Sequence, residues 1–325
     1  MNLLDLYFNA SSLVGFFTVF FVGIVIYARR GKSKINRNWF LISIFASIWS
    51  LFFFFIINSS NKSLSIFLRI LMDLCGILVV LFWYKFVTIF VKKVKVNNFL
   101  NLIVILFTIF MVGLNASPWM IRDMVPKFGF NYYVQADIGY YIFAVYFTGL
   151  ILIGSYLLLG EYKRSSGVRA EQIKYILFSV LMAFLGGGST FLLSLGIQIP
   201  PYTFILFSLF PLIIAYAIAR YRLMDVRLII LRSFAFILLI SLITALYAFI
   251  ASLTALVLKN FLGLSSNVLA GIVIAILVAV GYGPIKKIIE RNTNKYFYKL
   301  SYNPQELISK VTKISTSIID PQSLL

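Results

Sequence analysis

The sequence predicts an all-α integral membrane protein: a polytopic helical bundle of about nine transmembrane helices, with a small external hairpin or cap and a cytoplasmic signalling helix. Of its 325 residues, 61% are hydrophobic and 12% are charged. The mean hydropathy is +0.97. Apolar runs of about 20 residues, the length that crosses a bilayer, recur along the chain. This composition excludes a soluble globular protein.

Nine apolar runs have the length of a membrane span. The fourth and the ninth are the shortest or the most interrupted by glycine. The runs are Leu4 to Tyr27, Trp39 to Ile57, Ile66 to Val91, Phe99 to Leu114, Tyr140 to Leu159, Ile173 to Leu195, Tyr202 to Ala219, Leu228 to Leu258 and Leu264 to Tyr282.

Lysine and arginine residues lie mostly in alternate loops. Of the 29 cations, 23 fall on one side of the nine spans and four on the other, while Arg69 and Lys85 lie within the third span. Because cytoplasmic loops retain cations, the pattern predicts a membrane protein with its N-terminus outside and its C-terminus in the cytoplasm. The net charge of +19 then records orientation and contact with anionic membrane lipids, and it indicates no nucleic-acid partner.

Two segments outside the predicted spans are long enough to have structure. The external segment from Asn115 to Gly139 contains Pro126, Gly129 and a strand-like aromatic run from Phe128 to Val134, which together favour a small hairpin or cap. The other segment is the cytoplasmic tail, in which apolar residues become sparse and helically spaced.

The tail contains a helix start and a short apolar seam. Asn303 is an N-cap, Pro304 stands at the first helical position and Glu306 at the third. The 4-3-4 spacing that follows is typical of a two-stranded coiled coil, which would make the protein a homodimer. An amphipathic helix on the membrane or against another domain explains the spacing equally well. The seam residues are Leu307, Val311, Ile314 and Ile318.

Arg69 and Asp73 are ionisable residues within the third span, where a charge is costly. They stand four residues apart and therefore share one helix face. As an ion pair, they could hold two helices in register or line a polar pocket where a ligand would compete for the pair. In the structural alternative, Arg69 extends to the outer interface and a neighbouring helix satisfies Asp73.

Three consecutive glycines, Gly186, Gly187 and Gly188, interrupt the sixth span. Glycine allows helices to approach closely, and it also allows backbone to line a cavity. Close packing and a binding pocket are the two interpretations.

The residue types present exclude several kinds of chemistry. The chain has no histidine, so it has neither a His metal site nor a phospho-accepting histidine. Its single cysteine, Cys75, lies in an apolar run, which indicates a packing role. No phosphate-binding loop, paired-carboxylate site or metal-ligand cluster occurs in the sequence. We therefore expect no cofactor, no metal and no enzymatic activity in this chain.

The stretch from Gly167 to Arg232 resembles the N-terminal seven-transmembrane region of bacterial sensor histidine kinases. The run from Ala215 to Arg227 is the most specific part of the resemblance. The external Pro126 to Gly129 stretch and the Arg69 to Gly76 part of the third span resemble that region more loosely. The other matching pieces are Gly167 to Tyr175, the Gly186 to Gly188 run and the Leu195-Gly196 turn.

The resemblance implies a domain plan. Residues 1–219 would form the seven-transmembrane sensor bundle, residues 220–283 a linker with two further spans, and residues 284–325 a cytoplasmic linker that leads toward a GAF domain and a kinase. Since this sequence stops there, the output is either missing from it or carried by another chain, such as a GAF/histidine kinase or a response regulator. The linker residues that the resemblance singles out are Arg220, Arg222, Asp225 and Arg227.

The sequence therefore predicts a membrane sensory module of a two-component-type receptor. It would convert an external or intramembrane stimulus into movement of its last two helices and tail. The alternative is a small-molecule or lipid transporter. A transporter predicts two similar halves with discontinuous helices, whereas the sequence shows no convincing internal repeat and one conspicuous glycine break.

Overall fold

The computed structural model describes residues 3–30, 33–91 and 98–221. All of them belong to one compact unit, Met1–Val278. The eighth and ninth predicted spans and the tail helix lie outside the described residues.

Each of the first seven predicted spans is helical. Six of these helices are long and apolar enough to cross a membrane, and the seventh, Tyr202–Ile218, is a shorter apolar helix. A 3-10 turn, η1 (Tyr202–Ile205), leads into that last helix. The helices are α1 (Leu3–Arg30), α2 (Lys34–Asn58), α3 (Lys62–Phe90), α4 (Asn98–Asn115), α5 (Ile138–Arg164), α6 (Gly167–Ser194) and α7 (Leu206–Tyr221).

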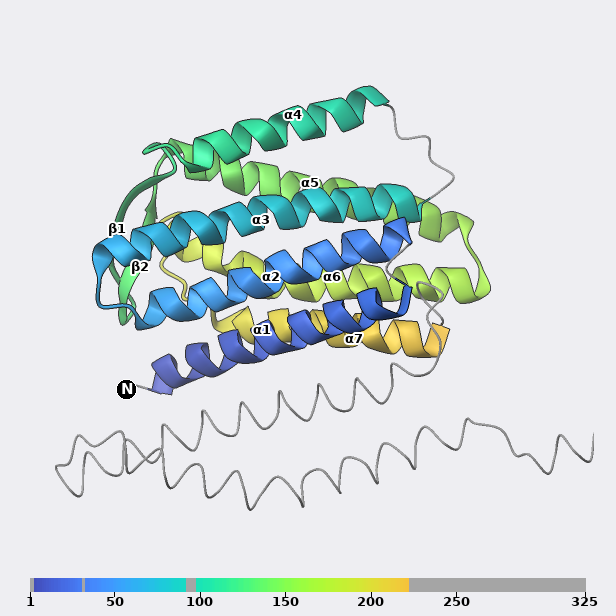
Figure 1. The fold of residues 1–325 in the computed structure, drawn as a ribbon, viewed down its shortest axis with the longest axis horizontal. Coiled ribbons are helices and arrows are strands. Elements are labelled where there is room, and N and C mark those ends of the chain that lie inside the picture. The colour runs from blue at the N-terminus through green and yellow to red at the C-terminus, as the bar shows by residue number, and fades with distance from the viewer. Residues whose placement is uncertain (1–2, 31–32, 92–97, 222–325) are drawn as a thin grey trace, which may run out of the picture. The chain divides into compact units, whose positions relative to one another are not determined.

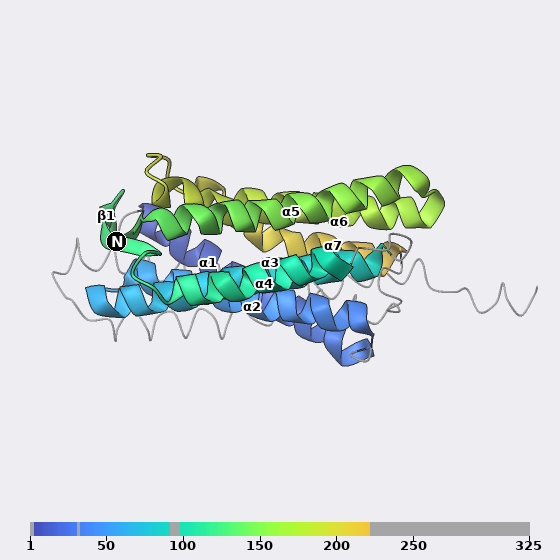
Figure 2. The same ribbon diagram turned by 90° about the horizontal axis from the view of Figure 1, so that it is seen from above.

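Six of the helices pack in a closed ring (Figures 1 and 2). Around the ring, α1 contacts α2, α2 contacts α3, α3 contacts α5, α5 contacts α6, α6 contacts α7, and α7 returns to α1. The remaining helix, α4, lies outside the ring against α3 and α5. Much of its apolar surface faces outward, as shown by Leu106 and Ile109, which are 56% and 63% exposed. A helix with that surface suits a lipid environment.

Small residues allow the helices of the ring to approach closely. Gly23 of α1 faces Ser43 of α2, where an added Cβ would lie 2.4 Å from the serine side chain. Ser50 donates to the Ser12 carbonyl at 2.8 Å, which links the same two helices. Glycine and serine at helix contacts are typical of membrane bundles.

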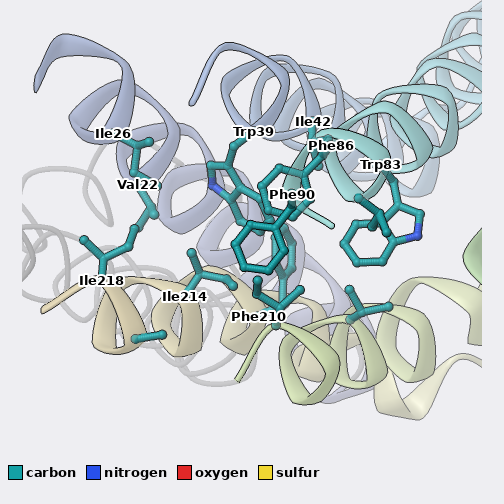
Figure 3. Packing of buried hydrophobic residues seen from close by; sticks show 14 of the residues in the cluster. Val22, Ile26, Trp39, Ile42, Trp83, Phe86, Phe90, Phe210, Ile214 and Ile218 are labelled. Atoms are coloured by element: carbon teal, nitrogen blue, oxygen red, sulfur yellow. The ribbon is translucent and has the colours of Figure 1, made fainter. Parts of the chain in front are cut away.

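A buried aromatic and aliphatic cluster joins α1, α2, α3 and α7 (Figure 3). Trp39 lies between Phe86 and Phe210, with ring centroids 5.4 and 6.3 Å away. Ile214 and Ile218 extend the cluster along α7 toward α1. This cluster connects α7, the helix that leads into the undescribed part of the chain, with the first three helices.

The predicted hairpin is present between α4 and α5. Strands β1 (Ile121–Lys127) and β2 (Phe130–Ala136) pair antiparallel. The second strand begins two residues later than the predicted run from Phe128 to Val134. Phe128 and Gly129 instead form the turn, with φ of 48° and 84°. Two positive φ values make a tight hairpin turn whose twist matches that of the strands. We call this side of the bundle the hairpin end and the opposite side the loop end.

Helix α6 is continuous through the glycine run, from Gly167 to Ser194. Every residue of the run keeps its helical backbone, as the predicted span Ile173 to Leu195 requires.

Candidate functional site

Arg69 and Asp73 form a buried ion pair on α3. Arg69 Nε lies 3.0 Å from Asp73 Oδ2, and the side chains are only 4% and 2% exposed. The helical spacing brings the two groups together, and the surrounding helices cover them. Arg69 does not extend to an interface, so the structure supports the paired interpretation and not the alternative of separate partners.

Other elements complete a polar cluster around this pair. Arg69 Nη2 donates to the Tyr140 hydroxyl of α5, and its guanidinium carbon lies 5.4 Å from the centre of the Tyr140 ring. From the hairpin, Tyr133 donates to the Thr190 carbonyl of α6 at 2.9 Å. We call Arg69, Asp73, Tyr133, Tyr140 and Thr190 the hairpin-end polar cluster. It connects α3, α5, α6 and β2 at one place.

The ion pair forms part of the wall of a cavity inside the ring. The cavity has a volume of about 80 Å³ and is lined by residues of α2, α3, α5, α6 and α7. Most of the wall is apolar and aromatic, including Trp49, Phe147 and Phe191. A mostly apolar cavity with a few convergent polar groups is the usual form of a small-molecule site.

The three glycines differ in their surroundings. A Cβ on Gly186 would lie 2.3 Å from the backbone nitrogen of Phe207, so this glycine allows α6 and α7 to touch. Gly187 lines the cavity, where a Cβ would meet the Phe207 and Trp49 rings at 3.6 and 3.7 Å. At Gly188, a Cβ would meet only the Phe184 ring, at 3.5 Å. Close packing and cavity lining are both present, at different glycines.

A second polar cluster lies at the loop end. Arg169 of α6 donates to the Phe90 carbonyl at 2.6 Å and stacks over the Phe90 ring at 3.9 Å. Its Nε lies 4.0 Å from Glu161 of α5. One turn along α6, Gln172 donates to the carbonyl of Tyr221 in the last turn of α7 at 2.9 Å. We call these five residues the loop-end cluster.

The hairpin carries its own electrostatic contacts. Lys62 at the start of α3 pairs with Asp123 at 2.7 Å, and the hydrogen bond from Lys62 lowers the pKa of that carboxyl. Lys127 donates to the Val134 and Leu193 carbonyls, both at 2.9 Å, and its partial burial lowers the pKa of its ammonium. Burial raises the pKa of the Tyr133 phenol. These contacts hold the hairpin across the ends of α3 and α6.

Few of the predicted linker residues can be placed. Arg220 lies in the last turn of α7 and is exposed. The others lie outside the described residues: Arg222, Asp225, Arg227, Leu307, Val311, Ile314 and Ile318.

Sequence reasoning missed Tyr133, Tyr140 and the pairing of Glu161 with Arg169. Tyr140 and Tyr133 lie 71 and 64 positions from Arg69, so no local spacing connects them. Glu161 is buried, with 8% of its surface exposed. Its Oε2 has no hydrogen-bond partner among the described residues. In the parts of the chain that the structure describes, no group of three potential metal ligands occurs.

The fold and the site define a class. This is a multi-pass helical membrane protein with a hairpin at one end, a buried ion pair and a cavity inside its ring of helices. The model of one protein family, the N-terminal 7TM region of histidine kinase, matches residues 11–227, which is most of the chain. The chain belongs to this family, as its sequence resemblance predicted. No curated protein and no solved structure matches it.

Proposed function

We propose that this chain is the sensing part of a two-component-type receptor and performs no catalysis itself. Membership of the histidine kinase 7TM region family supports the role, and the absence of histidine from the sequence supports the separation from the kinase chemistry. The observation that carries the proposal is the buried Arg69–Asp73 pair in the wall of a central cavity.

The orientation follows from the charges. Arg37, Lys163 and Arg169 are among the cations at the loop end, and the hairpin end has few. We place the loop end in the cytoplasm of a bacterial inner membrane and the hairpin outside, with anionic lipids around the loop-end cations.

The signal would pass from the cavity to the linker through α7. Phe207 and Phe210 of α7 line the cavity, and Tyr221 at its other end is held by the loop-end cluster. A stimulus that favours one packing of α7 over another would shift the position of the linker that begins at residue 220, since only a difference in affinity between two states moves their populations. Residues 220–283 and 284–325 would pass that shift to the output.

The proposal also includes a dimeric assembly and a cytoplasmic signalling partner. A homodimer joined along Leu307, Val311, Ile314 and Ile318 would receive the shift and pass it to a cytoplasmic GAF/histidine kinase or to a response-regulator partner. The transporter alternative receives no support, because it needs discontinuous helices at the cavity, and the described helices α1 to α6 have no break.

The test is a fusion of the full chain, after Leu325, to the catalytic region of a histidine kinase. We expect Asp73→Asn and Arg69→Gln each to change the autophosphorylation level at an unchanged amount of protein in the membrane. Phosphorylation equal to that of the unsubstituted fusion in both variants would refute the proposal. Thr88→Val is the matched control, because Thr88 also lies on α3 but bonds only within its own helix.

A further inference from the structure

The wall of the cavity restricts the chemistry of its occupant, and this inference rests on the function proposed above. We propose that the cavity binds a small, uncharged, mostly apolar molecule with one hydrogen-bond acceptor, such as a medium-chain ketone or ester. Its acceptor points to Arg69 and its chain lies along the aromatic wall.

The size and shape of the cavity favour a short, slender molecule. The cavity volume of about 80 Å³ is several times the minimum that one water needs, so the occupant is a small molecule. The lining residues of α3 run from Arg69 to Trp83, which a helix spreads over about 21 Å. A small volume distributed over that length suits an alkyl chain better than fused rings.

The wall along this length offers ring faces and aliphatic groups. Figure 3 shows the indole nitrogens of Trp39 and Trp83 pointing away from each other. A Cβ on Gly154 of α5 would lie 2.4 Å from Trp83 Nε1, so that N–H lies against the α5 backbone. Neither indole N–H has a hydrogen-bond partner among the described residues, while the ring faces add apolar surface that favours a hydrocarbon part in the occupant.

The polar groups of the wall differ in whether they already have a hydrogen-bond partner. Ser179 donates to the Phe210 carbonyl at 3.1 Å, and Thr190 donates to the Gly187 carbonyl at 2.7 Å. Arg69 differs, because a guanidinium has five N–H donors, and the contacts with Asp73 and Tyr140 engage two of them. The wall therefore offers unused donors, the remaining N–H groups of Arg69 and the indole N–H groups of Trp39 and Trp83, which favours an occupant with an acceptor.

The charge balance selects against an ionised occupant. Asp73 already compensates Arg69 at 3.0 Å, so the pair has no net charge to offer. An added carboxylate or ammonium would be buried without a counter-ion, which costs far more than burying a carbonyl that accepts one hydrogen bond. An uncharged acceptor gains from Arg69 without that cost.

The experiment measures thermal unfolding of the full chain in lipid nanodiscs with 2-heptanone, heptane or heptanoate at equal mole fraction in the lipid. We expect 2-heptanone to raise the midpoint temperature most, since binding to the folded state stabilises it. Ala183→Phe, which fills the cavity from α6, should abolish the shift, and Val79→Phe on α3 repeats the test if the first variant does not fold. Leu181→Phe is the matched control, because Leu181 is 48% exposed on the same helix, and it should keep the shift.

Three outcomes overturn the inference: an equal ketone shift in the filled variants, a heptanoate shift as large as the ketone shift, or no shift with any probe. In Arg69→Met/Asp73→Leu, 2-heptanone should raise the midpoint temperature no more than heptane does. If it still raises the midpoint temperature more than heptane, the inference is also contradicted. The unfolding measurement does not require a kinase fused to the chain. The two proposals can fail separately. If 2-heptanone raises the midpoint temperature specifically, but Asp73→Asn leaves the autophosphorylation of the fusion unchanged, the proposed function is refuted and the binding site is supported.

Discussion

At the scale of single residues, Arg69 and Asp73 depend on each other, because each buried charge is compensated by the other. The side chains are 4% and 2% exposed, so each charge is compensated almost wholly by the other and by Tyr140. Removing one member leaves a buried charge, whereas removing both leaves an apolar site. A structural role and a sensing role of the pair therefore respond differently to single and double substitutions.

We expect Arg69→Met alone to lower the free energy of unfolding by about 3–5 kcal/mol, because Asp73 is left without its partner. The double variant Arg69→Met/Asp73→Leu should recover most of that loss. Urea or thermal unfolding of the purified chain in nanodiscs checks both values. A double variant as unstable as the single one would show that the pair is needed for folding in itself.

The sequence predicted this pair but not its surroundings. A spacing of four on one helix is a local property, which sequence alone can identify. Tyr140 contacts Arg69, and Tyr133 contacts Thr190, because α5 and the hairpin pack against α3 and α6, and that arrangement depends on packing across the whole ring. The burial of Glu161 likewise depends on packing and not on a local pattern.

At the scale of elements, the seven described helices follow the predicted apolar runs closely, because length and hydropathy determine membrane spans. The glycine run does not end α6, because glycine within a membrane helix can serve packing without ending the helix. The contact of Gly186 with the Phe207 backbone shows this use.

The glycine run supplies a matched pair of substitutions. Gly186→Ala should lower the unfolding free energy by about 1–3 kcal/mol, because its Cβ would lie 2.3 Å from a backbone atom of α7 that cannot move aside. Gly188→Ala should be neutral or slightly stabilising, since its nearest contact is an ordinary 3.5 Å. Unfolding curves for the two variants check the difference, and equal losses would contradict the α6–α7 contact.

The loop-end cluster makes a second prediction about elements. Arg169→Gln should loosen the ends of α3, α5 and α6 together, because it removes the charge opposite Glu161 and the ring contact with Phe90. Hydrogen exchange of the Phe90 and Glu161 turns should become faster, while exchange at the hairpin stays unchanged. Faster exchange at the hairpin as well would indicate general destabilisation.

At the scale of the whole molecule, the ring places a cavity between two polar clusters at opposite ends. The hairpin-end cluster lies under the segment that we place outside the membrane, and the loop-end cluster holds the end of α7. That arrangement suits a module that receives a stimulus near one face and reports it at the other.

The proposed orientation can be checked with thiol labelling, because Cys75 is the single cysteine of the chain. In a Cys75→Ala background, we expect Phe128→Cys in the hairpin turn to react with a membrane-impermeant maleimide on intact spheroplasts. Ser166→Cys, between α5 and α6, should react only after the membrane is opened. The reverse pattern would place the cations outside and would contradict the sensory orientation.

The most direct test of the account measures whether a change at the ion pair moves the end of α7. Spin labels at Lys163→Cys on α5 and Arg220→Cys on α7, in the Cys75→Ala chain, report the distance between the two helix ends at the loop end. With and without Asp73→Asn, pulsed electron paramagnetic resonance in nanodiscs should give distance distributions that differ by about 1–2 Å or more, the size of common helix shifts in signalling proteins. Identical distributions in two folded proteins would contradict transmission from the cavity to the linker.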